Sequence, residues 1–175
     1  PELLPPMQDL GFEILVVFVL VLFKGIFAMS EIAIVSARKA RLQQWANEGN
    51  TRAQNALDLA NSPNRFLATI QVVITLVTLA TGAYGGSTIA EKMSVHLEGI
   101  PWIGQYRERI SLTVVVVLVG FLQVIFGELV PKSVALNHAE RIAALSAWPM
   151  QVVSRIAYPA VSFLGIVTDF ILRLV

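Results

Sequence analysis

Residues 110–126 are the feature that most constrains the fold of this chain. They form a run of seventeen residues without a charge, and thirteen of them are Ile, Leu, Val or Phe. On the membrane-insertion scale these thirteen side chains contribute about −5 kcal/mol. The run is too long for a buried strand, and in hydrocarbon a helix satisfies its own backbone hydrogen bonds. The run therefore predicts a membrane-spanning helix.

Two further segments have the same character. Residues 66–90 carry no charge, and residues 14–23 are ten consecutive Ile, Leu, Val and Phe side chains. The whole chain is only 14% charged, against roughly 25% in soluble domains. The sequence thus predicts an all-α integral membrane protein with one domain over residues 1–175 and three transmembrane helices. The predicted spans are about 12–35, 66–89 and 110–130, each close to the ~30 Å that a bilayer core requires.

Composition excludes several classes of protein. A net charge of +1 argues against a nucleic-acid partner, and the lack of cysteine excludes disulfides and thiolate-bound metals. Residues 1–11 contain no basic residue before the first apolar run, so a secretory signal peptide is not expected. No pairing of a nucleophile with a base is recognisable, and we expect no enzymatic activity.

The loops predict the orientation. Residues 36–65 hold an excess of Arg and Lys, whereas the charges of residues 91–109 balance and the N-terminal stretch has acids only. Basic loops stay in the cytosol. We therefore expect an inner (plasma) membrane protein with its N-terminus outside and its C-terminus in the cytosol.

The cytosolic segments are expected to be helical. Residues 36–62 predict a helical hairpin, with Gly49 ending the first helix and Asn50 capping the second. Residues 138–175 hold two apolar stretches of about thirteen residues, interrupted by Pro149 and Pro159. Each stretch is too short to cross, so amphipathic juxtamembrane helices at the inner interface are predicted. The alternative is a fourth crossing made by residues 156–175.

Ionisable side chains at membrane depth are the candidate functional residues, because each is costly unless paired or hydrated. Lys24 costs about 2.5–3.5 kcal/mol at its depth in the first span. Glu31 lies two turns further along the same helical face, about 10 Å away, which is too far for a direct pair. The alternative to a functional role is that Lys24 extends to an interface or balances a neighbouring carboxylate.

Glu128 ends the predicted third span, in the run Gly127-Glu128-Leu129-Val130-Pro131-Lys132. Because Pro131 has no N–H, it cannot donate to the Gly127 carbonyl four residues earlier. A freed carbonyl beside a carboxylate offers the oxygen ligands that hard cations prefer. The alternative is an ordinary helix end, with a proline stop and Lys132 near the negative end of the helix dipole.

Small and polar residues of the spans form a second group of candidates. Gln71, Thr75 and Thr78 share one helical face, where they serve either as ligands or as hydrogen-bonding contacts between helices. In lipid, close helix contacts are marked by small residues. Gly82, Gly85 and Gly86 either end the second span or permit a close helix contact. The candidates for the contact between two copies in a dimer are these three and Gly120.

Several short motifs resemble one known family. Residues 27–33 (Phe-Ala-Met-Ser-Glu-Ile-Ala) and 36–39 (Ser-Ala-Arg-Lys) resemble the start of the CNNM/CorC membrane domain. Residues 48–50 (Glu-Gly-Asn) and the Gly-Glu-x-x-Pro-Lys run of residues 127–132 resemble its next motifs, in the same order. The resemblance covers essentially the whole chain.

The resemblance implies a two-fold homodimer of three-span subunits with a cytosolic collar, and export of Mg²⁺ coupled to Na⁺. It also implies cytosolic CBS-pair domains, which would begin about where this chain stops. The chain has Ala28 where many Mg²⁺-type members have serine, and Ile74 and Thr78 where they have asparagines. Its Met-Ser-Glu form is similar to a bacterial branch for which polyamine export is proposed.

The expected cation site consists of Glu128 and the Gly127 carbonyl, with Glu31 close by and the hydroxyls of Ser30 and Thr75 as further ligands. Mg²⁺ is the first expected cargo and a polyamine or another divalent cation the second. A third hypothesis, from a different class, is a membrane anchor or dimerisation module for a cytosolic regulatory domain. That hypothesis predicts that the carboxylates are paired away from any cavity.

Overall fold

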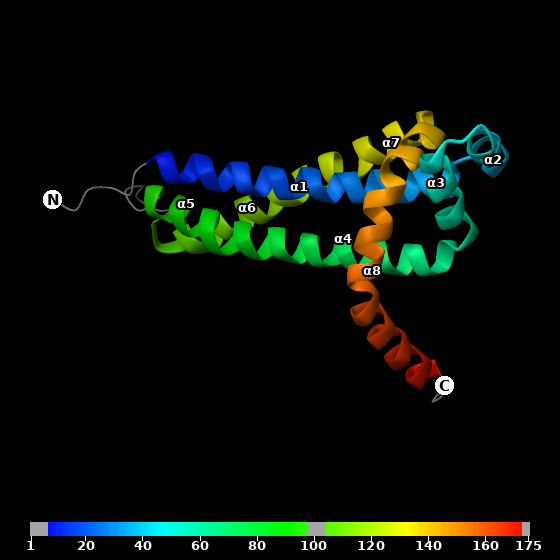
Figure 1. Cartoon of the computed structure of the whole chain (residues 1–175). Helices are drawn as coiled ribbons and strands as arrows, with labels where there is room; N and C mark the ends of the chain where they lie inside the picture. Colours follow the sequence, from blue (N-terminus) through cyan, green and yellow to red (C-terminus); the bar gives the residue numbers. More distant parts are fainter. Residues whose placement is uncertain (1–6, 98–103, 173–175) are drawn as a thin grey trace. The chain divides into compact units, whose positions relative to one another are not determined.

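The computed structural model describes residues 7–97 and 104–172, and within them every regular element is a helix (Figure 1). The all-α prediction is therefore confirmed. The elements in chain order are α1 (Met7–Ser36), α2 (Lys39–Asn47), α3 (Thr51–Asn61), α4 (Pro63–Tyr84), η1 (Gly85–Ile89), α5 (Ala90–His96), η2 (Gly104–Tyr106), α6 (Arg107–Val124), η3 (Ile125–Leu129), α7 (Val130–Asn137) and α8 (Ala139–Leu172).

Four helical stretches of the described residues are long and apolar enough to cross a membrane: Leu10–Ser36, Phe66–His96, Arg107–Asn137 and Ala139–Leu172. The first three coincide with the three predicted spans. Their apolar side chains point outward, as in Leu79 and Val117, each 64% exposed. Such a surface is unfavourable in water and suits contact with lipid.

The second and third spans are longer than predicted. The glycines after residue 81 do not end the second span, and Pro131 does not end the third. Each span instead passes through a π-helical turn, η1 or η3, and continues as α5 or α7. In these turns the Ala90 N–H donates to the Gly85 carbonyl and the Val130 N–H to the Ile125 carbonyl. A π-turn adds one residue without breaking the helix, and Pro131 is tolerated at the second position of α7.

The predicted break in residues 138–175 is wrong. Pro149 and Pro159 both lie inside the single 34-residue helix α8. An interior proline costs about 3 kcal/mol because it loses one hydrogen bond and crowds the preceding turn. In α8 this cost is offset by packing around the first proline, where Ala147 and Met150 are buried. The helix also meets the length and composition criteria of a fourth crossing, which was the alternative considered from the sequence.

The chain divides into two compact units. The first comprises residues 1–25 and 76–130. Its core is formed by Val17 and Val21 of α1, Ile89 and Ala90, and Val115 and Val119 of α6. A Cβ on Gly85 would lie 3.3 Å from Val119 Cγ2, so this glycine permits the close approach of η1 to α6.

The second unit comprises residues 26–75 and 131–175. Helices α2 and α3 occupy residues 39–61 of the predicted hairpin, and Ser36 belongs to α1. Gly49 has a φ of +92°, and the Asn50 side chain accepts hydrogen bonds from the backbone N–H groups of Arg52 and Ala53. Helix α3 packs through small side chains, such as Ala53 and Ala56, into a core that also includes the first half of α8. This core positions the pocket described below.

Candidate cation site

A partly buried ion pair is the most unusual feature of the first unit. Lys24 of α1 is only 4% exposed, and its Nζ donates to Glu128 Oε1 at 2.7 Å. An uncompensated ammonium at this depth would be costly, and a carboxylate at hydrogen-bonding distance removes most of that cost. Lys24 thus balances a neighbouring carboxylate, as one of the sequence hypotheses proposed.

Gly127 provides the space that the lysine stem needs. A Cβ at this position would lie 3.2 Å from Lys24 Cδ and 3.7 Å from Lys24 Cε. The π-turn η3 carries both Gly127 and Glu128, so one turn supplies the gap for the stem and the carboxylate for its end. One residue earlier, the Phe126 ring meets Phe18 of α1 edge-on, with ring centroids 6.0 Å apart. The turn is therefore fixed against α1 on both sides of Gly127.

The two members of the ion pair differ in their access to solvent. The Lys24 side chain is 4% exposed, whereas 41% of the Glu128 side chain is exposed. The ammonium lies on the buried side of the carboxylate. Glu128 therefore keeps exposed surface within this unit, whereas Lys24 keeps almost none.

The predicted site residues fall in both units. Gly127 and Glu128 lie in the first unit, whereas Ser30, Glu31 and Thr75 lie in the second. Ser30 is fully buried and its hydroxyl donates to the Ile26 carbonyl at 2.7 Å. The Thr75 hydroxyl donates to the Gln71 carbonyl at 2.8 Å. Both hydroxyls are thus engaged by their own helices, and the joint five-residue site stays a prediction.

Other polar contacts of the first unit were not foreseen. Glu13 of α1 accepts a hydrogen bond from the Tyr84 hydroxyl and another from Lys92 Nζ at 2.9 Å. The only signal in the sequence was that Glu13 shares the helical face of Lys24. The sequence could not name the partners, because they lie more than seventy residues away along the chain.

Helix α6 carries a further pair of buried polar groups. Ser111 and Gln123 are both buried residues of α6, and Gly127 of the following turn η3 is buried as well. The Ser111 hydroxyl and Gln123 Oε1 are buried and have no hydrogen-bond partner among the described residues. Gln123 lies one turn before Gly127, so its amide adds polar character to this end of the helix.

The arrangement suits the binding of a cation by one carboxylate. No group of three or more His, Cys, Asp or Glu side chains within residues 7–97 and 104–172 could hold a metal ion. Glu128 instead holds a primary ammonium, that of Lys24. A hydrated Mg²⁺ ion also needs only one or two carboxylates, because it keeps several of its waters.

Sequence comparisons place the chain among known proteins. Residues 15–175 match the family described as the Cyclin M transmembrane N-terminal domain, CNNM. The UPF0053 protein sll0260 of Synechocystis is 46% identical over 93% of this chain, which covers 36% of that protein. The polyamine export protein of Haemophilus influenzae is 29% identical over 95% of this chain and 38% of its own length.

A third relative, the UPF0053 protein YhdT of Bacillus subtilis, is 30% identical over 91% of this chain and 34% of its own length. The chain thus spans little more than a third of each of these relatives. The family match covers both units, the α2–α3 hairpin and the π-turn with Glu128. This chain is therefore a multi-pass membrane protein that belongs to the CNNM transmembrane domain family.

Proposed function

We propose that this chain is the membrane part of a cation exporter, and that the cation is a primary amine such as a polyamine. The observation that carries the proposal is the Lys24–Glu128 pair. A lysine side chain is a four-carbon chain that ends in an ammonium group. It has the same chemistry as one half of a linear diamine, so a site that seats it is suited to an alkylammonium ion.

The unequal exposure of the Lys24 and Glu128 side chains supports an exchange mechanism. With no cargo present, the buried Lys24 ammonium neutralises Glu128. An incoming alkylammonium reaches the exposed side of the carboxylate and competes with Lys24 for it. The carboxylate stays compensated throughout the exchange, while the displaced Lys24 ammonium bears the cost of an unpaired buried charge and so returns to Glu128 when the cargo leaves.

Two further facts bear on the choice of cargo. A relative that is 29% identical is named a polyamine export protein. Mg²⁺, with Na⁺ as the coupling ion, is the second candidate, and the exposed carboxylate of Glu128 favours it because a hydrated divalent ion needs such a group. The anchor hypothesis expects a paired carboxylate, but it gives no reason for the exposure of Glu128.

The test is transport by the purified chain in proteoliposomes, with putrescine and Mg²⁺ as separate cargoes. The double variant Lys24→Met with Glu128→Gln removes both charges of the pair and leaves no buried ammonium without a partner. We expect putrescine transport in the wild type and none in the double variant. Glu91→Gln, at an exposed acid of α5, is the matched control and should transport normally.

The outcomes separate the hypotheses. Transport of Mg²⁺ but not putrescine, lost in the same double variant, would replace the amine by Mg²⁺ as the cargo. Putrescine transport that survives in the correctly folded double variant would remove Glu128 from the site. If the wild type transports neither cation, the anchor hypothesis would stand.

A further inference from the structure

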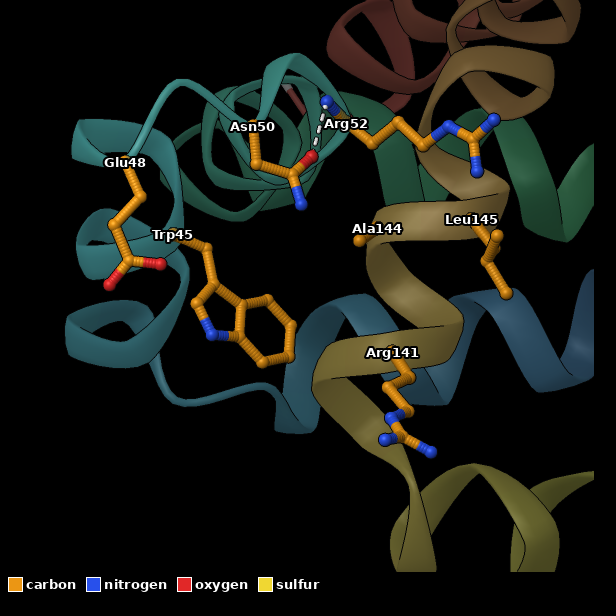
Figure 2. A pocket seen from close by; sticks show the side chains of 7 residues that line it. All are labelled: Trp45, Glu48, Asn50, Arg52, Arg141, Ala144 and Leu145. Carbon is orange, nitrogen blue, oxygen red and sulfur yellow. Dashed lines mark hydrogen bonds between the residues drawn. The ribbon is translucent and has the colours of Figure 1, made fainter.

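A pocket of the second unit lies at the corner between α2 and α3, against the first turns of α8 (Figure 2). Its volume is about 430 Å³. The residues that line it are Trp45, Glu48, Asn50, Arg52, Arg141, Ala144 and Leu145. None of them belongs to the cation site.

Positive charge dominates the rim of the pocket. Arg52 comes from the first turn of α3 and Arg141 from the first turn of α8, and both are exposed. No ion pair joins either of them to a carboxylate within the described residues. A third guanidinium, that of Arg41, lies 5.3 Å from the centre of the Trp45 ring. Arg41 thus covers the Trp45 ring, while Arg52 and Arg141 line the pocket from α3 and α8.

The backbone that carries these arginines is held in place. Asn50 caps α3 one turn before Ala53 and so fixes the start of the helix at Arg52. Glu140, next to Arg141, accepts a hydrogen bond from Arg38 Nε at 2.7 Å, which fixes the start of α8. Further along, Gln151 Nε2 donates to the Asn55 carbonyl at 3.3 Å and ties α8 to α3. The pocket is therefore part of the folded unit.

An exposed apolar stripe leads away from the pocket along α8. It begins at Leu145, which lines the pocket, and continues at steps of three or four residues. Its members are Leu145, Trp148, Val152 and Ile156, which are 62%, 64%, 37% and 74% exposed. A basic pocket beside an exposed apolar stripe is complementary to a phospholipid, which has a charged headgroup and long apolar chains.

We propose that this pocket binds the phosphate group of an anionic glycerophospholipid, with the acyl chains along the apolar stripe of α8. The planar guanidinium forks of Arg52 and Arg141 match phosphate oxygens in a bidentate geometry. Basic pockets on the cytosolic side of membrane proteins bind lipid headgroups, and tryptophan favours the same interface. The positive-inside rule places the basic hairpin at the cytosolic leaflet, which is consistent with this ligand.

Glu48 sets the charge that the pocket accepts. Two guanidinium groups and one carboxylate leave the lining with a net charge of +1, which a phosphodiester with one negative charge neutralises. Glu48 Oε1 accepts a hydrogen bond from Gln44 Nε2 at 3.1 Å, which holds the carboxylate on α2. Its charge repels the phosphate, so Glu48→Gln should bind the lipid more tightly than the wild type.

The experiment measures lipid binding to the purified 175-residue chain in detergent, by native mass spectrometry with phosphatidylglycerol or phosphatidylcholine. We expect phosphatidylglycerol to bind preferentially. The double variant Arg52→Gln with Arg141→Gln should lose about ten- to thirtyfold in affinity, the effect of two arginines near an anionic surface. The variant Arg107→Gln with Arg109→Gln removes the same charge from the first unit and should bind like the wild type.

Three results would overturn the proposal. One is equal binding of phosphatidylglycerol by the wild type and by the folded Arg52/Arg141 variant. The second is weaker binding by Glu48→Gln than by the wild type. The third is full competition by glycerol 3-phosphate without any lipid preference, which would identify a site for soluble phosphate. A loss of folding in the arginine variant leaves the Glu48→Gln result to decide the question.

Discussion

At the scale of single residues, the Lys24–Glu128 pair joins stability to the proposed transport. Breaking a buried ion pair by removing one partner is usually more harmful than removing both, because an uncompensated charge stays behind. Here the two partners are unequal, since Lys24 is buried and Glu128 is 41% exposed. The effects of the two single substitutions should therefore differ.

Glu128→Gln should lower the free energy of unfolding by about 2 kcal/mol, because it leaves the buried Lys24 ammonium without its charged partner. Lys24→Met should cost less, since the exposed Glu128 carboxylate can turn toward water. The double variant should be more stable than Glu128→Gln alone. Thermal unfolding in detergent measures all four proteins of this double-mutant cycle. Additive effects would show that the two side chains do not interact.

Gly127→Ala tests the gap for the lysine stem. The new Cβ would lie 3.2 Å from Lys24 Cδ, so we expect a loss of about 1 kcal/mol in stability and weaker alkylammonium binding. In a Lys24→Ala background the stem is absent and the same substitution should be tolerated. Gly165→Ala is the control, because nothing lies within 4 Å of a Cβ there. Equal losses in both Lys24 backgrounds would contradict the close contact.

At the scale of elements, the π-turn η3 decides where Glu128 points. Its extra residue shifts the helical face by about 100° relative to an uninterrupted α-helix, and Pro131 follows two residues after its end. A proline at this position has no N–H to complete a normal α-helical turn. The turn carries the carboxylate that meets Lys24, and we expect the proline to favour the turn over a regular α-helix.

Pro131→Ala should let this region return to regular α-helix. We expect the protein to fold and to keep all its charges, but to bind putrescine severalfold more weakly because Glu128 is no longer aligned. Isothermal titration in detergent measures the change. Pro149→Ala is the control, since that proline lies inside α8, in the second unit. Unchanged binding by Pro131→Ala would show that the proline does not position the site.

At the scale of the whole molecule, the topology can be read with single cysteines, because the chain contains none. Cysteines at Asn47 and Leu172 should be labelled only from the cytosolic side, and a cysteine at Gln105 only from outside. This pattern is expected for three crossings with α8 at the inner interface. Labelling of Leu172 from outside would identify α8 as a fourth crossing.

The predicted dimer can be tested at its small residues. Gly85 already packs against Val119 within the subunit. A Cβ on Gly82 or Gly120, by contrast, would meet nothing within 4 Å. Gly82 and Gly120 are therefore the better candidates for contact with a second copy. Substitution of either by leucine should shift the detergent-solubilised protein from dimer to monomer in light scattering. A wild type that is already monomeric would contradict the dimer.

The sequence by itself determined the membrane class, the three predicted spans and the capped α2–α3 hairpin. These features depend on local physics: the length of an apolar run, the lack of charge within it, and the fit of Gly49 and Asn50 to a helix junction. The continuity of α8 through two prolines was missed. Local rules count the full cost of each proline and ignore the packing around Pro149 that offsets it.

Only the tertiary structure decided which charges meet. Lys24 and Glu128 are 104 residues apart, and no periodicity in the sequence connects them. The π-turns also lay beyond prediction, because a π-turn depends on how a helix packs against its neighbours more than on its own residues. The basic pocket also depends on packing between helices, because Arg52 lies in α3 and Arg141 in α8. Each of these features needs long-range packing, which a single sequence does not encode in any local pattern.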